Sequence, residues 1–194
     1  MDSNAFIFFG RSGCGKGTQA KLIQEYLTNK DKKSLYVETG AGLRDLAKRN
    51  NYSGEITRNI LGEGGLFPVF LPVWIWSNFL IDNFTGKENL ILDGVCRRIT
   101  ESMALDSALG FYNVKNRYVI LMDVSRHWAF DRLKNRGRAD DTDKSINNRL
   151  DWFEKDTIPA IDYFKNNSNY KFIKINGEQT IEEVHKDILK DSNL

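Results

Sequence analysis

The sequence predicts an α/β domain built on a parallel five-stranded sheet flanked by helices. Short apolar runs alternate with longer segments of helical period, and the first apolar run ends directly in a glycine-rich turn. A chain of 194 residues with 41% hydrophobic content can bury a sizeable core. No internal repeat, low-complexity tract or change of composition marks a second domain. Residues 1–194 are therefore predicted to form a single domain.

Each element is predicted from its own pattern. Short runs rich in β-branched residues, leucine or aromatic residues are expected to be strands buried on both faces. These runs are 5–9, 34–37, 89–92, 118–122 and 170–175. Helices are expected near 16–28, 41–50, 54–62, 69–83, 101–111, 126–136, 144–166 and 180–190. Strands separated by helices imply right-handed crossovers, so ligands should bind at the carboxyl ends of parallel strands.

The segment 10–18, Gly-Arg-Ser-Gly-Cys-Gly-Lys-Gly-Thr, joins the first strand to the first helix. Its glycines allow a tight turn whose N–H groups cradle phosphates, and the following helix N-terminus favours an anion. Lys16 can reach the β- and γ-phosphates of a nucleotide, and Thr18 can direct its hydroxyl toward Mg²⁺. Gly17 departs from the strict pattern, which has Ser or Thr directly after the lysine. A chance glycine-rich turn is the alternative, but the spacing, the lysine and the flanking elements count against it.

Asp93 ends the third apolar strand. Beside a phosphate loop, a carboxylate in this place suits Mg²⁺ held through water. The alternative is an aspartate that only caps a turn. The loop favours the magnesium role.

Composition limits the other classes of function. The formal charge of +2 is too small to indicate a nucleic-acid or membrane partner. Cys14 and Cys96 form no disulfide framework and have no metal-site spacing, which fits a reducing compartment. The most apolar segment, 67–81, contains two prolines and is too short to span a bilayer. Since the N-terminus is also unlike a signal peptide, a cytoplasmic location is expected.

With these motifs the chain resembles the adenylate kinase family of nucleoside monophosphate kinases, in its short-lid form. The Gly-Lys-Gly-Thr-Gln version of the loop is specific to this resemblance and explains Gly17. The segment 93–97, Asp-Gly-Val-Cys-Arg, is similar to the family's Asp-Gly-Phe-Pro-Arg but departs from it at Val95 and Cys96. The resemblance runs from Phe6 to about Lys190. It implies a P-loop kinase-type fold with a mobile acceptor-binding segment, about 39–68, and a short lid, about 132–143.

The resemblance also implies roles for individual residues. The expected ATP-binding residues are Gly13, Cys14, Gly15, Lys16, Gly17, Thr18, Arg132, Arg136 and Gln179. The expected acceptor-binding residues are Thr39, Gly40, Arg44, Gly65, Leu66, Phe67, Gly94, Arg97, Glu101, Arg138 and Arg149. The expected catalytic residues are Lys16, Arg97, Arg136, Arg138 and Arg149, and the expected magnesium residues are Thr18 and Asp93. A single arginine would be interpreted as a solvated helix face, but six in family register beside a phosphate loop favour phosphate binding.

The implied reaction moves the γ-phosphoryl group of ATP, with Mg²⁺, to a nucleoside monophosphate, most simply AMP. Glu101 stands where AMP-using members place a glutamine. An ionised carboxylate only accepts hydrogen bonds, so its chemistry favours the two adjacent donors of guanine, whereas the family register favours AMP. A GMP or pyrimidine monophosphate kinase of the same fold is one alternative, and a P-loop kinase with a non-nucleotide acceptor is another. A third alternative, from another class of function, is a nucleotide-binding regulatory module without transfer activity.

The remaining expectations concern the lid and the partners. Only Gly137 separates Arg136 from Arg138, so a longer lid insertion has no room, and zinc is excluded because neither cysteine is near. The partners should be small nucleotides, and the chain should be a monomer. Cys14 is either a reactive thiol or a shielded one. The aromatic stretch 67–84 is either an oligomer surface or, more simply, core packing.

Overall fold

The computed structural model describes residues 3–138 and 140–194. It contains a five-stranded sheet in the order β2-β3-β1-β4-β5, with all neighbouring strands parallel. The strands are β1 (Asn4–Gly10), β2 (Ser34–Glu38), β3 (Asn89–Asp93), β4 (Asn116–Asp123) and β5 (Lys171–Asn176). The predicted parallel sheet is confirmed. Four strands contain the run expected for them, and β5 is shifted by one residue.

The helices follow the predicted order. They are α1 (Lys16–Thr28), α2 (Thr39–Ala47), α3 (Tyr52–Gly62), α4 (Phe70–Asn83), α5 (Ile99–Phe111), α6 (Arg126–Arg136), α7 (Asp143–Trp152), α8 (Ile158–Lys165) and α9 (Ile181–Ser192). The segment 144–166, predicted as one helix, differs from the prediction because a π turn, Phe153–Thr157, divides it into α7 and α8. Helix α9 begins with a capping box, in which Thr180 and Glu183 bond reciprocally.

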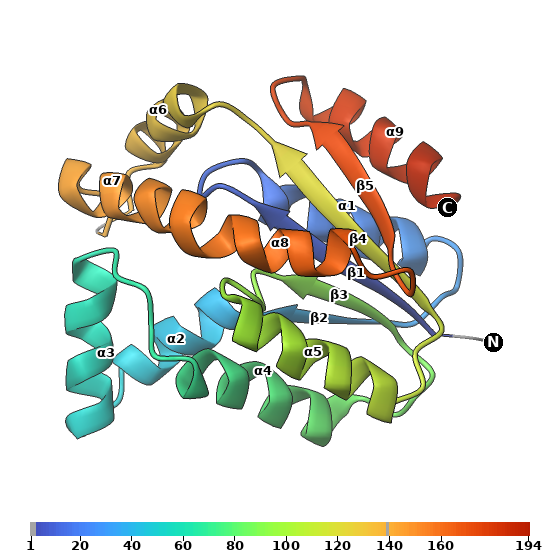
Figure 1. Cartoon of the computed structure of the whole chain (residues 1–194), viewed down its shortest axis with the longest axis horizontal. Helices are drawn as coiled ribbons and strands as arrows, with labels where there is room; N and C mark the ends of the chain where they lie inside the picture. Colours follow the sequence, from blue (N-terminus) through green and yellow to red (C-terminus); the bar gives the residue numbers. More distant parts are fainter. Residues whose placement is uncertain (1–2, 139) are drawn as a thin grey trace.

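The core lies on both faces of the sheet. Along β1, Ala5, Ile7 and Phe9 pack into the cluster that contains buried residues of α4, α5 and α8. Phe6 and Phe8, which alternate with them, pack against α1 and α9 on the opposite face. Figure 1 shows these two helix layers in front of and behind the strands. A strand covered on both faces is apolar at successive positions, which is why β1 is a continuous hydrophobic run.

Helix α4 is aromatic on two sides. Trp76, together with Phe67 just before the helix, is buried, as core packing of this stretch predicts. Phe70 and Trp74 differ from that prediction, since they are 70% and 46% exposed. Within the described residues, no helix is long and apolar enough to cross a membrane.

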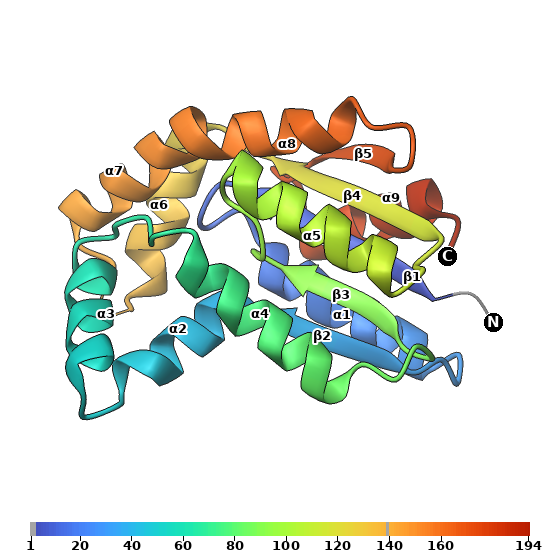
Figure 2. The ribbon, with the colours of Figure 1, turned by 60° about the horizontal axis from the view of Figure 1, so that its bottom comes forward.

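The sheet brings its functional loops to one edge. Because all five strands are parallel, their carboxyl ends point the same way, toward α2, α3, α6 and α7. Figures 1 and 2 both place these helices beyond that edge, with the two chain ends on the opposite side. The site should therefore lie between the strand ends and these helices.

Candidate active site

A cleft of about 710 Å³ opens at this edge of the sheet. It is lined by four groups of residues, from the phosphate loop, from the 36–67 region, from the loop after β3 and from the segment 132–152. The lining residues that the sequence singles out are Gly13, Gly15, Lys16, Gly17, Thr18, Gly40, Arg44, Gly65, Phe67, Asp93, Gly94, Arg97, Arg132, Arg136, Arg138 and Arg149. The structure thus brings together most of the predicted site, from segments far apart in the chain.

The phosphate loop is held in a conformation that requires glycine. Gly10 has φ +144°, and a Cβ there would lie 2.6 Å from the Met122 carbonyl oxygen. Gly15, at φ +93°, precedes the first turn of α1. Lys16 Nζ donates to the carbonyl oxygens of Gly10, at 2.7 Å, and Arg11, at 2.9 Å. The loop therefore curls around the ammonium group, which lies at the helix start that favours an anion.

Cys14 lies beneath this loop rather than in the cleft. It is 1% exposed, and a Cβ on Gly10 would meet its sulfur at 2.6 Å. The sequence allows either a reactive or a shielded thiol at Cys14, and the structure favours the shielded one. Any contact of Cys14 with a ligand would be through its backbone.

Asp93 is buried at the end of β3 and faces the start of α1. Its Oδ2 accepts from the Tyr36 hydroxyl at 3.0 Å, and a Cβ on Gly17 would lie 3.2 Å from the same oxygen. Gly17 therefore leaves room beside the carboxylate that a Ser or Thr would fill. Burial raises the pKa of Asp93, and the charge of Lys16 and the Tyr36 hydrogen bond oppose this rise.

Arg44, from α2, and Arg97, from the loop after β3, both line the cleft. Arg44 Nη2 pairs with Glu38 Oε1 at 2.6 Å. The guanidinium of Arg97 lies over the Trp152 ring, with Cζ 5.0 Å from its centroid. Burial lowers the pKa of Arg97, and the charges of Glu101 and Asp93 oppose this change. A desolvated guanidinium that faces a cleft favours an anionic ligand.

A smaller pocket adjoins the cleft and is lined by Thr39, Leu43, Leu66, Phe67, Pro72, Gly94, Arg97 and Glu101. Glu101 Oε2 accepts from the Arg97 backbone N–H at 2.7 Å. Among the described residues, Glu101 Oε1 and Thr39 Oγ1 have no hydrogen-bond partner, although both side chains are buried. Burial raises the pKa of Glu101 against the hydrogen bond and charge of Arg97. Buried polar atoms without partners suit a ligand that supplies them.

The arginines of α6 and α7 meet at one carboxylate. Arg136 binds Asp141 through two hydrogen bonds, of 2.9 and 2.8 Å, and Arg149 Nη2 lies 2.9 Å from the same group. Burial, together with the charges of Arg136 and Arg44, lowers the pKa of Arg138. Arg132 stacks on Trp128, with Cζ 4.7 Å from the ring centroid. This concentration of positive charge suits a polyphosphate.

Gln179, like Cys14, is a predicted ATP-binding residue that does not line the cleft in the described structure. The side-chain amide of Gln179 donates to the Asn176 carbonyl oxygen and to Asp187. Conversely, the sequence missed the roles of Tyr36 and Trp152 as cleft residues. The position of Trp152, three residues after Arg149 on one helix, is the signal that could have found it.

The parallel sheet and its phosphate loop define the class of protein, a P-loop nucleotide-binding enzyme of α/β architecture. The family model for adenylate kinase matches residues 8–169. Adenylate kinase 1 of Nostoc sp. is 33% identical over 92% of both chains. Adenylate kinase of Azobacteroides pseudotrichonymphae is 33% identical over 94% of this chain and 93% of its own. Uridylate kinase of Saccharomyces cerevisiae is 27% identical over 96% of this chain and 90% of its own.

The chain therefore belongs to the adenylate kinase family. It is a nucleoside monophosphate kinase, an enzyme that transfers a phosphoryl group to a nucleoside monophosphate.

Proposed function

We propose that this kinase transfers the γ-phosphoryl group of ATP to AMP and so yields two molecules of ADP. The observation that carries the proposal is the composition of one cleft, which is lined by the phosphate loop and by arginines from α2, α6, α7 and the loop after β3. Two nucleotides that meet phosphate to phosphate bring several negative charges into one space. Such a lining supplies the matching cations.

ATP occupies the phosphate-loop side in this proposal. The backbone of residues 13–18 holds its phosphates, Lys16 neutralises the β- and γ-phosphates, and Arg132 and Arg136 reach the nucleotide from α6. The backbone of the 176–179 segment reaches the adenine, so the side chain of Gln179 is not required there. These roles are supported by the cleft lining and by the anion-favouring start of α1.

Thr18 and Asp93 provide the hard oxygen donors that Mg²⁺ prefers, and both line the cleft beside Lys16. Gly17 places no side chain next to Asp93. In this proposal Asp93 would hold the ion through water. When bound, Mg²⁺ neutralises charge on the phosphate oxygens. Lys16 and the loop N–H groups hold the phosphate chain in line with the acceptor.

AMP occupies the side of α2 and the loop after β3. Arg44 and Arg97 bind its phosphate, and Thr39, Gly40, Gly65, Leu66, Phe67, Gly94 and Glu101 line the space for the nucleoside. During transfer, Arg97, Arg136, Arg138 and Arg149 stabilise the charge on the moving group, and no general base is needed. Closure of the acceptor-binding segment, about 39–68, and of the lid, about 132–143, excludes water that would otherwise compete with AMP.

The choice of acceptor depends on Glu101. The two relatives that are 33% identical to this chain are adenylate kinases by name, which supports AMP. The lone Oε1 of Glu101 supports a second candidate, GMP, because an ionised carboxylate can accept from N1–H and the 2-amino group of guanine together. A neutral Glu101 both accepts and donates and so suits adenine, and the raised pKa of this carboxyl supports that form.

A coupled assay with ATP and Mg²⁺ across AMP, GMP, CMP and UMP tests the proposal. We expect the highest kcat/KM for AMP. A higher value for GMP would support the second candidate, and a higher value for UMP or CMP a pyrimidine acceptor. Transfer to none of the four would instead indicate a nucleotide-binding regulatory module. The cytoplasmic location, the monomeric state and the absence of zinc stay predictions.

A further inference from the structure

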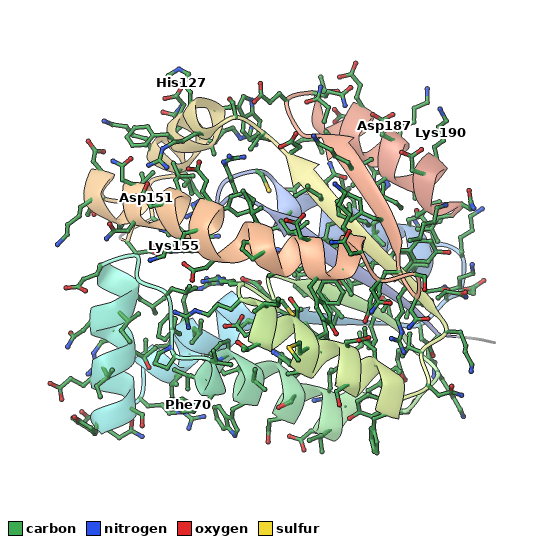
Figure 3. All side chains as sticks on the ribbon, viewed as in Figure 1. Phe70, His127, Asp151, Lys155, Asp187 and Lys190 are labelled. Carbon is green, nitrogen blue, oxygen red and sulfur yellow. The ribbon has the colours of Figure 1, made fainter. Side chains whose placement is uncertain are left out.

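The joint between α7 and α8 is wider than an α-helix. Ile158 N–H donates to the Phe153 carbonyl oxygen, which is the i to i+5 bond of a π turn. Asp151 and Lys155 project from this segment into solvent, as Figure 3 shows. Trp152 and Thr157 instead turn toward the protein, and Thr157 is 3% exposed. The inner side of the turn therefore carries contacts that its outer side does not.

Both inner residues contact Arg97. Trp152 places its ring 5.0 Å from the guanidinium carbon, and the Thr157 hydroxyl donates to the Arg97 carbonyl oxygen at 3.1 Å. In an ideal α-helix, two residues five positions apart would point about 140° away from each other. The wider π turn brings them back to one side. This explains how one short segment can hold both the backbone and the side chain of the same arginine.

Trp152 has a second partner in the acceptor-binding segment. Its indole N–H donates to the Gly64 carbonyl oxygen at 3.0 Å. Gly64 has φ +65°, and a Cβ there would clash with the backbone of Ser145. The 39–68 segment therefore approaches α7 closely at this point. A single indole thus joins that segment to the guanidinium of Arg97.

The same turn also contacts the phosphate loop. The Arg11 guanidinium stacks on Phe153, with Cζ 4.9 Å from the ring centroid, and its Nη2 pairs with Glu154 at 3.3 Å. Arg11 Nη1 donates to the Val124 carbonyl oxygen at 2.8 Å. One turn of helix therefore touches the donor side and the acceptor side of the cleft.

We propose that Trp152 and Thr157 are positioning residues that set Arg97 for the acceptor phosphate, with the π turn placing them on one side. The proposal rests on the proposed function, in which Arg97 binds that phosphate. Thr157 fixes the backbone from which the side chain of Arg97 extends. Trp152 limits the guanidinium to a position over the face of its ring and, through its indole N–H, relates that position to Gly64.

Thr157→Val and Thr157→Ser form a matched pair of variants. Valine keeps the shape of threonine but removes the hydrogen bond to Arg97, and serine keeps the hydroxyl. We expect Thr157→Val to raise KM for the acceptor about tenfold with KM for ATP unchanged, and Thr157→Ser to restore the wild-type value. Thr28→Val is the control, because Thr28 makes a similar hydroxyl-to-carbonyl bond on the exposed end of α1. It should leave both KM values unchanged.

Trp152→Phe and Trp152→Leu separate the two contacts of the indole. Phenylalanine keeps an aromatic face for Arg97 but loses the N–H that bonds Gly64, and leucine loses both. We expect acceptor KM to rise for both variants, by about threefold for phenylalanine and by about tenfold or more for leucine.

A double-mutant cycle with Arg97→Ala tests whether Thr157 acts through Arg97. In the Arg97→Ala background, Thr157→Val should leave acceptor KM unchanged. A full tenfold effect in that background, or equal acceptor KM for Thr157→Val and Thr157→Ser, would overturn the inference. If the wild type transfers to no nucleoside monophosphate, the proposed function fails separately. In that case, Kd values for AMP, measured by calorimetry in the same variants, test the positioning role. They should change by the same factors as those expected for acceptor KM.

Discussion

Arg136 and Asp141 form a two-pronged ion pair, with Nε donating to Oδ2 at 2.9 Å and Nη2 to Oδ1 at 2.8 Å. The carboxylate is 1% exposed and also binds Arg149. Burial opposes its charge, but the hydrogen bond and charge of Arg136 and the charge of Arg149 outweigh this and lower the pKa of Asp141. The ion pair therefore adds to the free energy of unfolding above the ordinary aspartate pKa of about 3.9. This contribution is lost as the pH falls through the lowered pKa of Asp141.

Asp141→Asn tests whether this carboxylate orients the two arginines. Asparagine has nearly the same shape but cannot balance two guanidinium charges. We expect kcat to fall about tenfold, because Arg136 and Arg149 lose their common anchor before the phosphates arrive. Asp143→Asn is the matched control, because Asp143 is an exposed carboxylate two residues along the same segment, and it should leave kcat unchanged. Equal kcat for Asp141→Asn and the wild type would show that the ion pair is only structural.

Glu101→Gln tests how the acceptor base is recognised. The neutral amide both accepts and donates, which matches the amino group and N1 of adenine, while the ionised carboxylate only accepts. We expect kcat/KM for AMP relative to GMP to rise at least tenfold, a difference of about 1.4 kcal/mol. Steady-state kinetics with both acceptors measure this ratio. An unchanged ratio would mean that Glu101 does not contact the base.

The same carboxyl gives a pH dependence with a defined sign. Burial raises the pKa of Glu101, so its neutral form persists to higher pH than for an exposed glutamate. Lower pH then favours adenine and higher pH favours guanine. We expect the AMP to GMP ratio of kcat/KM to fall as the pH rises through the pKa of Glu101, which lies above the ordinary value of about 4.3. In Glu101→Gln the ratio should be flat, and a parallel slope in both proteins would contradict the assignment.

The sequence was sufficient for the sheet and for most of the cleft because both follow local patterns. Buried strands are continuous apolar runs, and the phosphate loop needs its glycines, as Gly10 and Gly15 show by their positive φ. The π turn could not be predicted in this way. The apolar period of 144–166 continues on both sides of Phe153–Thr157, and one additional residue in a turn leaves little trace in it.

The directions of individual side chains could not be predicted from the sequence either. Cys14 has the right position in the loop, yet its thiol points under the loop, toward Gly10. Glu101 has the right spacing from Arg97, yet one of its oxygens already binds the Arg97 backbone. Trp152 carries no motif, and only the fold places it against Arg97. Such contacts depend on how distant segments pack, which spacing alone does not specify.

The buried thiols give a prediction about chemical modification. Cys14 and Cys96 are 1% and 3% exposed, so a bulky thiol reagent should react with neither at an appreciable rate in the folded protein. We expect both thiols to react with the reagent only in denaturant. Activity should survive incubation of the folded protein with the reagent. Rapid loss of activity that ATP and Mg²⁺ prevent would show instead that the loop opens and that Cys14 is a reactive thiol.

The most direct measurement is kcat of Lys16→Met with ATP, Mg²⁺ and AMP. The hydrogen bonds of Lys16 Nζ go to two loop carbonyls and to the Cys14 sulfur, and methionine is nearly as long as lysine, so the variant should keep the fold of the wild type. Because the ammonium group is proposed to neutralise the β- and γ-phosphates during transfer, we expect kcat to fall by several orders of magnitude. Retention of more than about a tenth of the wild-type kcat would contradict phosphoryl transfer at this cleft.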